Sequence, residues 1–566
     1  MATDSAQFEL DSKTVGALPI INRIIERIGL PDILGLALPS RPSQKLSHVD
    51  AVLLFLRNIL LERKPLYRLH EWAASFEPNL LGLASASPSI LNDDRVGRSL
   101  DALFDADRAT LLTQVVLAVI REFAVDLSQF HNDSTTVTVY GNYNAQRSTR
   151  KGRTSIAVAH GHNKDFRPDL KQVLFSLTVS RDGAVPLHYK AFDGNTTDDQ
   201  THILIWESLR RLAGRSDFIY VADSKLCTRE QTDYISKEGG RFITVLPETR
   251  KECTWFLEWK RAHKIQWQHL LKRPDHRRPG SPGAWHHYWG FESPLPSEEG
   301  FRILWIRSSQ KRDLDVRTRQ ARIEKTIAAL DSLKSRVAAR QWWTKERITA
   351  AVDDILGKYK AAKWFDWKLI SDDTVSFKQK GKGRPGKNRH YTKLVKTKWS
   401  FEVLPNPLKI QADADRDGIF PLLTNIPSAD APMKQILLKY KYQPYIEKRH
   451  QQFKSVFSAA PVFLKAPHRI EALMFVYFLV LLVNALIERE LRLSMAREGI
   501  SSLPLYPEER KCKHPTTTRL LEIFETQRRH ILSSRGKQVR LFVDPLTKIQ
   551  EKLLDLLSVS NQPYTS

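Results

Sequence analysis

The spacing of apolar residues separates a helical first part of the chain from a strand-rich part that follows it. Up to about residue 128, apolar side chains recur three and four positions apart, and prolines interrupt the runs. From Gln129 onward, Thr, Val and Tyr follow the alternation that is typical of strands. We therefore predict a helical N-terminal domain over residues 1–128, whose basic side chains suit either DNA binding or a solvated surface.

The strand-rich part, residues 129–247, is predicted to be a mixed α/β domain. Asp133 lies on its first strand, and Asp223 ends its fourth, which is apolar enough to be buried on both faces. A carboxylate at the end of a buried strand is where open α/β sheets place chemistry, although it can equally cap the helix that follows. The strands are expected at 129–143, 171–180, 186–192, 218–222 and 241–246, with helices at 200–212 and 228–237.

Residues 248–432 form a longer and more basic region that is rich in tryptophan. The stretch from Arg317 to Tyr359 has the spacing of one or two amphipathic helices. Between Lys378 and Lys398 no acidic residue occurs, so we predict a flexible basic loop that contacts phosphates, with an ordinary solvated loop as the alternative. The candidate phosphate contacts are Lys380, Lys382, Arg384, Lys387 and Arg389.

The stretch from Tyr440 to Lys454 brings an acid and a base together. Pro444 is expected to open a helix, because proline is favoured in the first helical turn. After about two turns of regular helix, Lys454 returns to the face of Glu447. This helix either presents both side chains to one ligand or carries ordinary surface charges. A second stripe, expected to be buried, consists of Ile446, Phe453 and Phe457.

The apolar run from Ala472 to Ile487 is the one candidate for a membrane span. It is shorter than the ~20 apolar residues that a spanning helix needs, and Asn484 interrupts it. We therefore expect a buried core helix within residues 433–505 and no membrane association. Residues 506–566 are predicted to form a helical C-terminal tail.

Composition indicates the class of binding partner and the cellular compartment. The chain of 566 residues has 88 Lys and Arg against 63 Asp and Glu, a net charge of +25, and a pI near 9.8. Such a basic excess indicates a polyanion as partner, either nucleic acid or an acidic membrane. Three cysteines far apart in sequence do not form a disulfide framework, and no secretion signal is visible at the N-terminus. We therefore expect a cytoplasmic protein.

Three carboxylates, Asp133, Asp223 and Glu447, are the candidate catalytic groups. If they converge, their mutual repulsion calls for a cation, and hard oxygen ligands suit Mg²⁺ or Mn²⁺. Two such ions can support phosphodiester hydrolysis and transfer without a nucleophilic Ser or Cys, and the sequence shows no convincing triad.

The motifs around these acids resemble those of the DDE transposases of bacterial insertion sequences, in the group marked by Y-x2-R-x3-E-x6-K. Tyr440, Glu447 and Lys454 match this motif at the required spacing, whereas Gln443 stands at the arginine position. The resemblance continues in HNDSTT around Asp133, in GHNKDFRPDLKQ at 161–172, in ADSKLC around Asp223, and in DGIFPLLTN at 417–425. It covers roughly residues 45–525.

What the resemblance implies is a ribonuclease-H-like catalytic domain whose mixed sheet and helices are interrupted by an insertion domain. The catalytic parts would be residues 129–247 and 433–505, the insertion domain residues 248–432. The resemblance also implies binding of the element's inverted repeats and target DNA as a homodimer, followed by strand cleavage and transfer of a 3′-hydroxyl.

Residue by residue, the resemblance makes the three acids the ligands of two Mg²⁺ or Mn²⁺ ions. It makes Tyr440 and Lys454 contacts to DNA near the cleaved end. Gln443 can hydrogen-bond a phosphate oxygen but supplies no charge, so either Lys448 or Arg449 provides it or binding at that point is weaker.

Two other functions remain compatible with the sequence. One is a DNA-binding protein that descends from such an enzyme but no longer catalyses a reaction. The other is a metal-dependent DNA nuclease that cuts without joining. All three functions place the protein on DNA in the cytoplasm, at the bacterial nucleoid.

Overall fold

The computed structural model describes most of the chain and divides it into two compact units. It describes residues 8–40, 44–83, 90–143, 147–162, 167–197, 201–274, 285–339, 342–384, 390–459, 462 and 464–565. Unit 1 comprises residues 1–244, 424–426 and 436–566, and unit 2 comprises residues 245–423 and 427–435. The chain therefore leaves unit 1 after its fifth central strand and returns to it near residue 436.

The central sheet of unit 1 contains the five predicted strands in the spatial order β6-β5-β2-β7-β8. β2 is antiparallel to β5 and parallel to β7, and β7 is parallel to β8. Apolar and β-branched residues fill these strands, which explains why their extent could be predicted. Their bounds are β2 Gln129–Val139, β5 Lys171–Ser180, β6 Pro186–Phe192, β7 Ile219–Val221 and β8 Arg241–Val245, with helices α7 His202–Ala213 and α8 Arg229–Lys237. The structure is thus a mixed α/β fold.

The N-terminal part of unit 1 is mainly helical, as predicted. The isoleucines of α1 fall on one buried face, and Ser47 caps α3 by accepting a hydrogen bond from the Asp50 amide. The helices are α1 Leu18–Ile28, α2 Leu30–Ala37, α3 His48–Leu61, α4 Leu69–Ala74, α5 Asp93–Asp105 and α6 Arg108–Phe123, with short 3₁₀ turns η1 Leu66–Arg68 and η2 Pro78–Leu81.

A three-stranded sheet joins the two ends of the chain and was not predicted. β1 (Phe8–Thr14) pairs antiparallel with β15 (Arg528–Ser534), which pairs with β16 (Lys537–Val543). The expected helical tail is therefore only partly helical, since its helices α16 (Thr517–Ile523) and α17 (Lys548–Leu556) flank these two strands.

Helix α15 (Pro467–Arg497) forms the core of unit 1. It is long and apolar enough to cross a membrane, but 94% of its most apolar window is buried inside the protein. It packs on α1, α3 and α5 as well as on β6. The prediction of a core helix at this place is confirmed. Helix α13 (Met433–Tyr440) and helix α14 (Gln443–Gln451) precede it, and α14 continues into a π-helical segment, Gln452–Val456.

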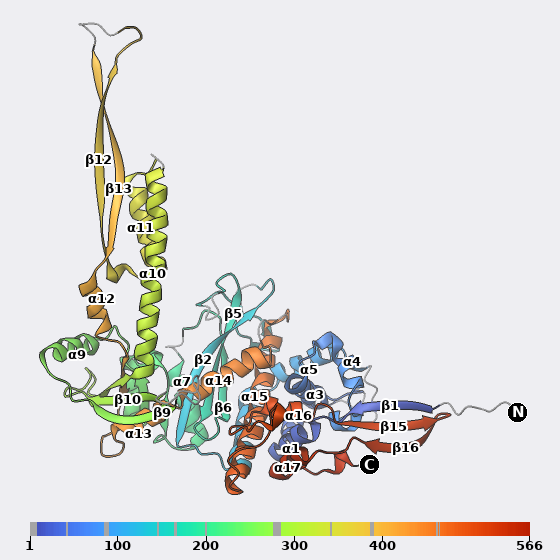
Figure 1. Cartoon of the computed structure of the whole chain (residues 1–566). Coiled ribbons are helices and arrows are strands. Elements are labelled where there is room, and N and C mark those ends of the chain that lie inside the picture. The colour runs from blue at the N-terminus through green and yellow to red at the C-terminus, as the bar shows by residue number, and fades with distance from the viewer. Residues whose placement is uncertain are drawn as a thin grey trace. The chain divides into compact units, whose positions relative to one another are not determined.

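Unit 2 combines a small sheet, several helices and a long β-ribbon. α10 and α11 flank Trp342 and Trp343, as the sequence predicted, and the ribbon of β12 and β13 runs beside them (Figure 1). Within unit 2 the sheet order is β14-β11-β10-β9. The elements are α9 Lys251–Ala262, β9 Gln268–Pro274, β10 Trp285–Glu292, β11 Arg302–Ser308, α10 Ser309–Ala339, α11 Lys345–Lys358, β12 Phe365–Gln379, β13 Tyr391–Pro405, α12 Pro407–Ala414 and β14 Ile419–Thr424.

Candidate active site

The parallel pairing of β2 with β7 brings Asp133 and Asp223 to the same level of the sheet. The last residues paired in this register are His131 and Val221, and each aspartate follows two positions later. Neighbouring strands lie about 4.8 Å apart, and residues two positions apart share a face. The two carboxylates therefore come from adjacent strands, at the point where β7 ends.

Local hydrogen bonds fix both aspartates. Asp133 Oδ1 accepts from the Ser134 amide at 2.8 Å. The Asp223 side chain accepts from the Lys225 amide at 3.0 Å and so caps the short 3₁₀ helix η5 (Ser224–Leu226). An ionised carboxylate has about four acceptor sites, so this cap leaves Asp223 capable of binding a further ligand. The two roles that the sequence left open for Asp223 are thus compatible.

One face of helix α14 lies over β2 and carries Glu447. Gln443, Glu447 and His450 are spaced four and three residues apart, which places them on the same side of the helix. Gln443 Nε2 donates to the Asn132 carbonyl at 3.0 Å, and His450 Nε2 lies 3.7 Å from Asp133 Oδ2. Glu447, between them on the helix, is exposed.

The charges of all three carboxylates affect the pKa of the Tyr440 hydroxyl. Burial is the main reason that the pKa of Tyr440 is raised to about 12, and the negative charges of Asp223, Glu447 and Asp133 act in the same direction. The charges of two strand carboxylates and one helix carboxylate thus act on a single phenol, which stays protonated at neutral pH. The third acid, remote in sequence, contributes to the same electrostatic environment as the first two.

The donor chemistry of this site fits a hard divalent cation. Carboxylate oxygens are the ligands that Mg²⁺ and Mn²⁺ prefer. Within the part of the chain that the structure describes, however, no three His, Cys, Asp or Glu side chains are grouped closely enough to hold a metal ion. The three acids share one electrostatic environment without closing a ligand cage.

Gln443 is an interior residue, which corrects the expectation that it contacts DNA. It is 7% exposed, and its Oε1 lies 2.8 Å from His131 Nδ1. Gln129 Nε2 donates to His131 Nε2 at 2.7 Å, so the ring proton lies on Nδ1 and is donated to Gln443. Burial lowers the pKa of His131 to about 4, which keeps the ring neutral. An arginine, which has no acceptor, could not replace Gln443 here without breaking this bond.

Arg449 is likewise part of the interior, and the expectation that it meets DNA phosphates is wrong. Its guanidinium donates to the carbonyls of Gly183 and Ala184, both at 3.0 Å. It also donates to Gln452 Oε1 at 2.8 Å and forms an ion pair of 2.9 Å with Glu488 on α15. These bonds hold α14 to α15 and to the turn between β5 and β6.

Lys448 and Lys454 occupy different settings on the same helical segment. Lys448 is exposed, with its ammonium 5.3 Å from the Tyr445 ring centroid. Lys454 is partly buried and lies in the π-helical segment, where Phe457 N bonds to Gln452 O. The regular helix predicted to run from Pro444 to Lys454 is therefore interrupted, because the turn that contains Lys454 is π-helical. The buried stripe of Ile446, Phe453 and Phe457 is confirmed.

The predicted basic loop, residues 378–398, includes both ends of a β-ribbon, because β12 extends to Gln379 and β13 begins at Tyr391. The candidate phosphate contacts lie between these strands. Lys380, Lys382 and Arg384 follow β12 and are exposed. Lys387 and Arg389 lie outside the described residues. Alternating Val, Phe, Thr and Tyr in this segment were the signal for strands, and the density of lysine and glycine obscured it.

His131 and His450 are site residues that the sequence analysis missed. Neither forms a recognisable motif. The packing of α14 on β2 brings His450 near Asp133 and Gln443 to His131. The one available signal was spacing, since His450 lies three residues after Glu447.

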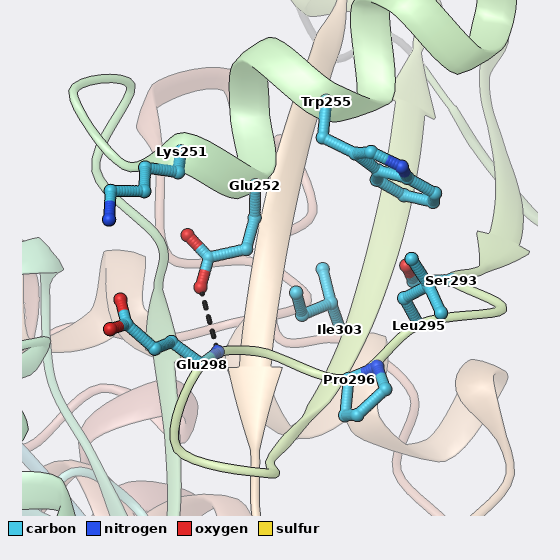
Figure 2. Close-up of a pocket in the computed structure, with 8 residues that line it drawn as sticks. All are labelled: Lys251, Glu252, Trp255, Ser293, Leu295, Pro296, Glu298 and Ile303. Carbon is cyan, nitrogen blue, oxygen red and sulfur yellow. Dashed lines mark hydrogen bonds between the residues drawn. The ribbon is translucent and has the colours of Figure 1, made fainter.

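Unit 2 contains a separate pocket of about 220 Å³ between α9 and the loop after β10. Figure 2 shows Lys251, Glu252 and Trp255 on the helix facing Leu295 and Glu298 of the loop. The Glu298 amide donates to Glu252 Oε1 at 3.0 Å. Although burial opposes it, bonding to Arg250 and this amide holds the pKa of Glu252 at about 2. The pocket's carboxylate thus fastens the loop to the helix.

Comparisons with known proteins give one partial family match and two distant structural likenesses. A family model described as a domain of unknown function, DUF4277, matches residues 10–117, which cover α1 to most of α6. No curated protein matches the chain. The chain is similar to a piggyBac transposase in a synaptic complex with hairpin DNA, at 8% identity and a TM-score of 0.35, over 90% of this chain and 78% of that one. It is similar to the Mos1 transposase in a paired-end complex with the left transposon end, at 11% identity and a TM-score of 0.13, over 35% and 58%. At these values neither likeness assigns a role to a residue.

Proposed function

We propose that this protein is a metal-dependent DNA transposase of the DDE class, which cleaves the ends of an insertion sequence and transfers a 3′-hydroxyl into target DNA. The observation that supports this most is the arrangement of the three acids. Asp133 and Asp223 follow paired residues of adjacent parallel strands, α14 packs on β2, and the charges of Glu447 and both aspartates raise the pKa of the same phenol, Tyr440. This arrangement supports the same three acids that the motif resemblance indicates.

Asp133, Asp223 and Glu447 would hold two Mg²⁺ or Mn²⁺ ions. Such ions, when bound, activate a water or a 3′-hydroxyl and stabilise the leaving oxygen. The chain positions these ligands by three devices: the β2–β7 register, the Asp223 cap and the bonds of Gln443 to His131 and to the Asn132 carbonyl.

The surroundings of the acids supply groups for the DNA backbone. Tyr440 keeps its proton at neutral pH and can donate it to a phosphate oxygen. Lys448 and Lys454, on the same helical segment, supply positive charge. The exposed Lys380, Lys382 and Arg384 add phosphate contacts in unit 2. The partners would be the inverted repeats and the target duplex, bound by a homodimer in the cytoplasm at the nucleoid.

A cleavage and strand-transfer assay tests the proposal, with duplexes that carry the inverted repeats flanking the coding sequence. Asp223→Asn should reduce both products at least about a hundredfold, since even residues that only support a metal ligand cost 10–100-fold. The matched control is Asp217→Asn, just before the same strand, because its side chain is exposed and its removal should leave both products unchanged.

Three results would contradict parts of the proposal. Equal products from the wild type and Asp223→Asn would exclude Asp223 as a catalytic group. DNA binding without any product in Mg²⁺ or Mn²⁺ would indicate a DNA-binding protein that has lost catalysis. Cleavage without joined products would indicate a nuclease.

A second readout tests the metal ligands independently of activity. Because a ligand that binds only the folded state stabilises it, Mn²⁺ should raise the unfolding temperature of the wild type. The increase should disappear in Asp133→Asn and persist in Asp217→Asn. An equal increase in all three proteins would place the cation elsewhere.

A further inference from the structure

The ribbon of β12 and β13 has two chemically different faces. Its antiparallel register pairs Val375 with Val395 and Gln379 with Tyr391, and side chains alternate between faces along each strand. We call residues 371–379 and 391–398 the outer ribbon. Its apolar face carries Val375, Phe377, Tyr391 and Val395 together with Lys393 and Asp373. Its basic face carries Lys378, Lys396 and Lys398 with the hydroxyls of Thr374, Ser376 and Thr392, and also Asp372 and Leu394.

The apolar face is buried in the inner part of the ribbon and bare in the outer part. Phe365 and Phe401 belong to this face and are buried in a core with residues of α10 and α11. Farther out, the same face leaves Phe377 66%, Val395 52%, Tyr391 50% and Val375 46% exposed. A two-stranded ribbon is marginally stable alone, and exposed apolar patches mark interaction surfaces. The outer ribbon therefore has the character of a binding surface.

Charge decides what binds there. Between residues 371 and 398 the sequence contains nine Lys and Arg and two Asp. The ribbon of a second copy would carry the same excess and would be repelled. A polyanion is attracted instead, because four of these basic residues lie on the outer ribbon and the other five lie between its two strands.

The two-faced arrangement distinguishes a nucleic acid groove from a flat acidic membrane. A membrane that meets the apolar face would leave Lys378, Lys396 and Lys398 pointing away from it, since they stand on the opposite face. The major groove of DNA is about 12 Å wide and 8.5 Å deep, and it admits a two-stranded ribbon. With one face at the floor of such a groove, the other face stands near the rim, where the phosphates lie.

We propose that the outer ribbon is a DNA-binding arm, which lies in a groove of duplex DNA with its apolar face at the floor and its basic face at the phosphate rim. This proposal rests on the proposed function in that DNA is the substrate. It goes beyond phosphate contact by single lysines, because it assigns Phe377 and Val395 to the groove and gives the two faces separable roles.

Binding of the full chain to a duplex of mixed sequence, measured over a range of salt concentrations, tests the arm. Lys396→Gln/Lys398→Gln should lower the slope of log affinity against log salt by about 1.8, at about 0.9 for each phosphate that the protein no longer neutralises. Phe377→Thr/Val395→Thr should weaken binding about tenfold with an unchanged slope, because it removes apolar surface and no charge. Threonine keeps the preference for strand structure, so the ribbon should persist.

Two control variants match these changes away from the ribbon. Lys325→Gln/Lys334→Gln removes two charges from exposed positions of α10, and Leu408→Thr removes a side chain that is 82% exposed on α12. Both should bind as the wild type does.

The possible failures are distinguishable from one another. If the wild type binds DNA and both ribbon variants bind equally well, the arm is refuted while the proposed function stands on the Asp223 assay. The apolar variant could instead keep its DNA affinity but lose self-association or binding to anionic vesicles. The apolar face would then contact a second copy or a membrane, and the arm is again refuted. If the wild type binds no DNA at any salt concentration, the arm and the proposed function fail together.

Discussion

Helix α14 and the outer ribbon both contain residues that the sequence assigned to DNA, but they use polar side chains in opposite ways. In α14, Gln443 and Arg449 are buried, and their donors and acceptors are bonded to the protein. In the outer ribbon, residues 371–378 and 391–398 are all exposed. The first region uses its polar groups to hold a helix in place, and the second leaves them exposed.

The difference matches what the two proposed roles require. As a catalytic carboxylate, Glu447 would have to stand at a fixed position relative to two strands, and buried hydrogen bonds supply that rigidity. A contact to phosphates needs charge density more than fixed geometry, and exposed lysines supply it. Substitutions in α14 should therefore mainly lower stability, whereas substitutions in the outer ribbon should mainly lower DNA affinity.

Replacement of Arg449 should have the largest effect on stability. Arg449→Met leaves Glu488 buried and deprived of its partner on α14, which should cost about 3–5 kcal/mol in the free energy of unfolding. Denaturant unfolding measures this loss. Lys448→Met, at the exposed neighbouring position, should change stability by less than about 0.5 kcal/mol.

A double variant sharpens this first test. Arg449→Met/Glu488→Met removes both charges, and apolar replacement of a whole buried pair is often neutral, so most of the stability should return. A single variant that unfolds no more easily than Lys448→Met would show that the buried pair does not anchor α14.

Replacement of Gln443 should have a smaller effect on stability, accompanied by a loss of catalysis. Gln443→Leu leaves His131 Nδ1 and the Asn132 carbonyl without this partner, at about 1–3 kcal/mol for a buried group left unsatisfied. Because Glu447 lies one turn farther along α14, strand transfer should fall more than DNA binding does. The control is Gln451→Leu, at an exposed position of the same helix.

Gln443→Arg tests why the chain departs from the motif of the group it resembles. A buried cation beside the neutral His131 lacks an acceptor for the Nδ1 proton, so this variant should be no more stable than Gln443→Leu. Tighter DNA binding by Gln443→Arg at unchanged stability would contradict the interior role of this residue.

The sheet and the core helix could be predicted because local pattern determines them. Alternating residues from Gln129 and the apolar run that ends in Asp223 gave β2 and β7 nearly at their observed bounds. The run from Ala472 to Ile487 lies within α15, where almost every side chain is buried. A segment that is buried on all sides is apolar along its whole length. It can therefore be recognised without knowing which elements pack against it.

The surroundings of the acids could not be predicted in the same way, because they depend on pairings between distant segments. Whether Gln443 meets DNA or His131 depends on how α14 lies on β2, more than 300 positions earlier in the chain. The same holds for β1, which is a strand because β15 pairs with it. The ribbon was missed for another reason, since its lysines and glycines resemble a loop while its register is set by cross-strand pairs.

Mild acid should lower the stability of unit 1 through a histidine with a buried ring nitrogen, His188. This loss should be smaller than the loss expected for Arg449→Met. His188 on β6 has its Nδ1 buried, with no hydrogen-bond partner among the described residues. Burial, and then the charges of Lys190 and Arg211, lower its pKa from 6.5 to about 4. Between these values the unfolded chain binds a proton that the folded protein does not, so stability falls as the pH falls, by up to about 1.4 kcal/mol per pH unit. Unfolding of the wild type and His188→Asn, followed from pH 7.5 to pH 5, should show a shallower pH dependence for the variant, because it lacks this proton uptake. Parallel curves would show that His188 is protonated equally in the folded and unfolded states. Its side chain would then be open to water in the folded protein, which contradicts the shielding implied by the packing of β6.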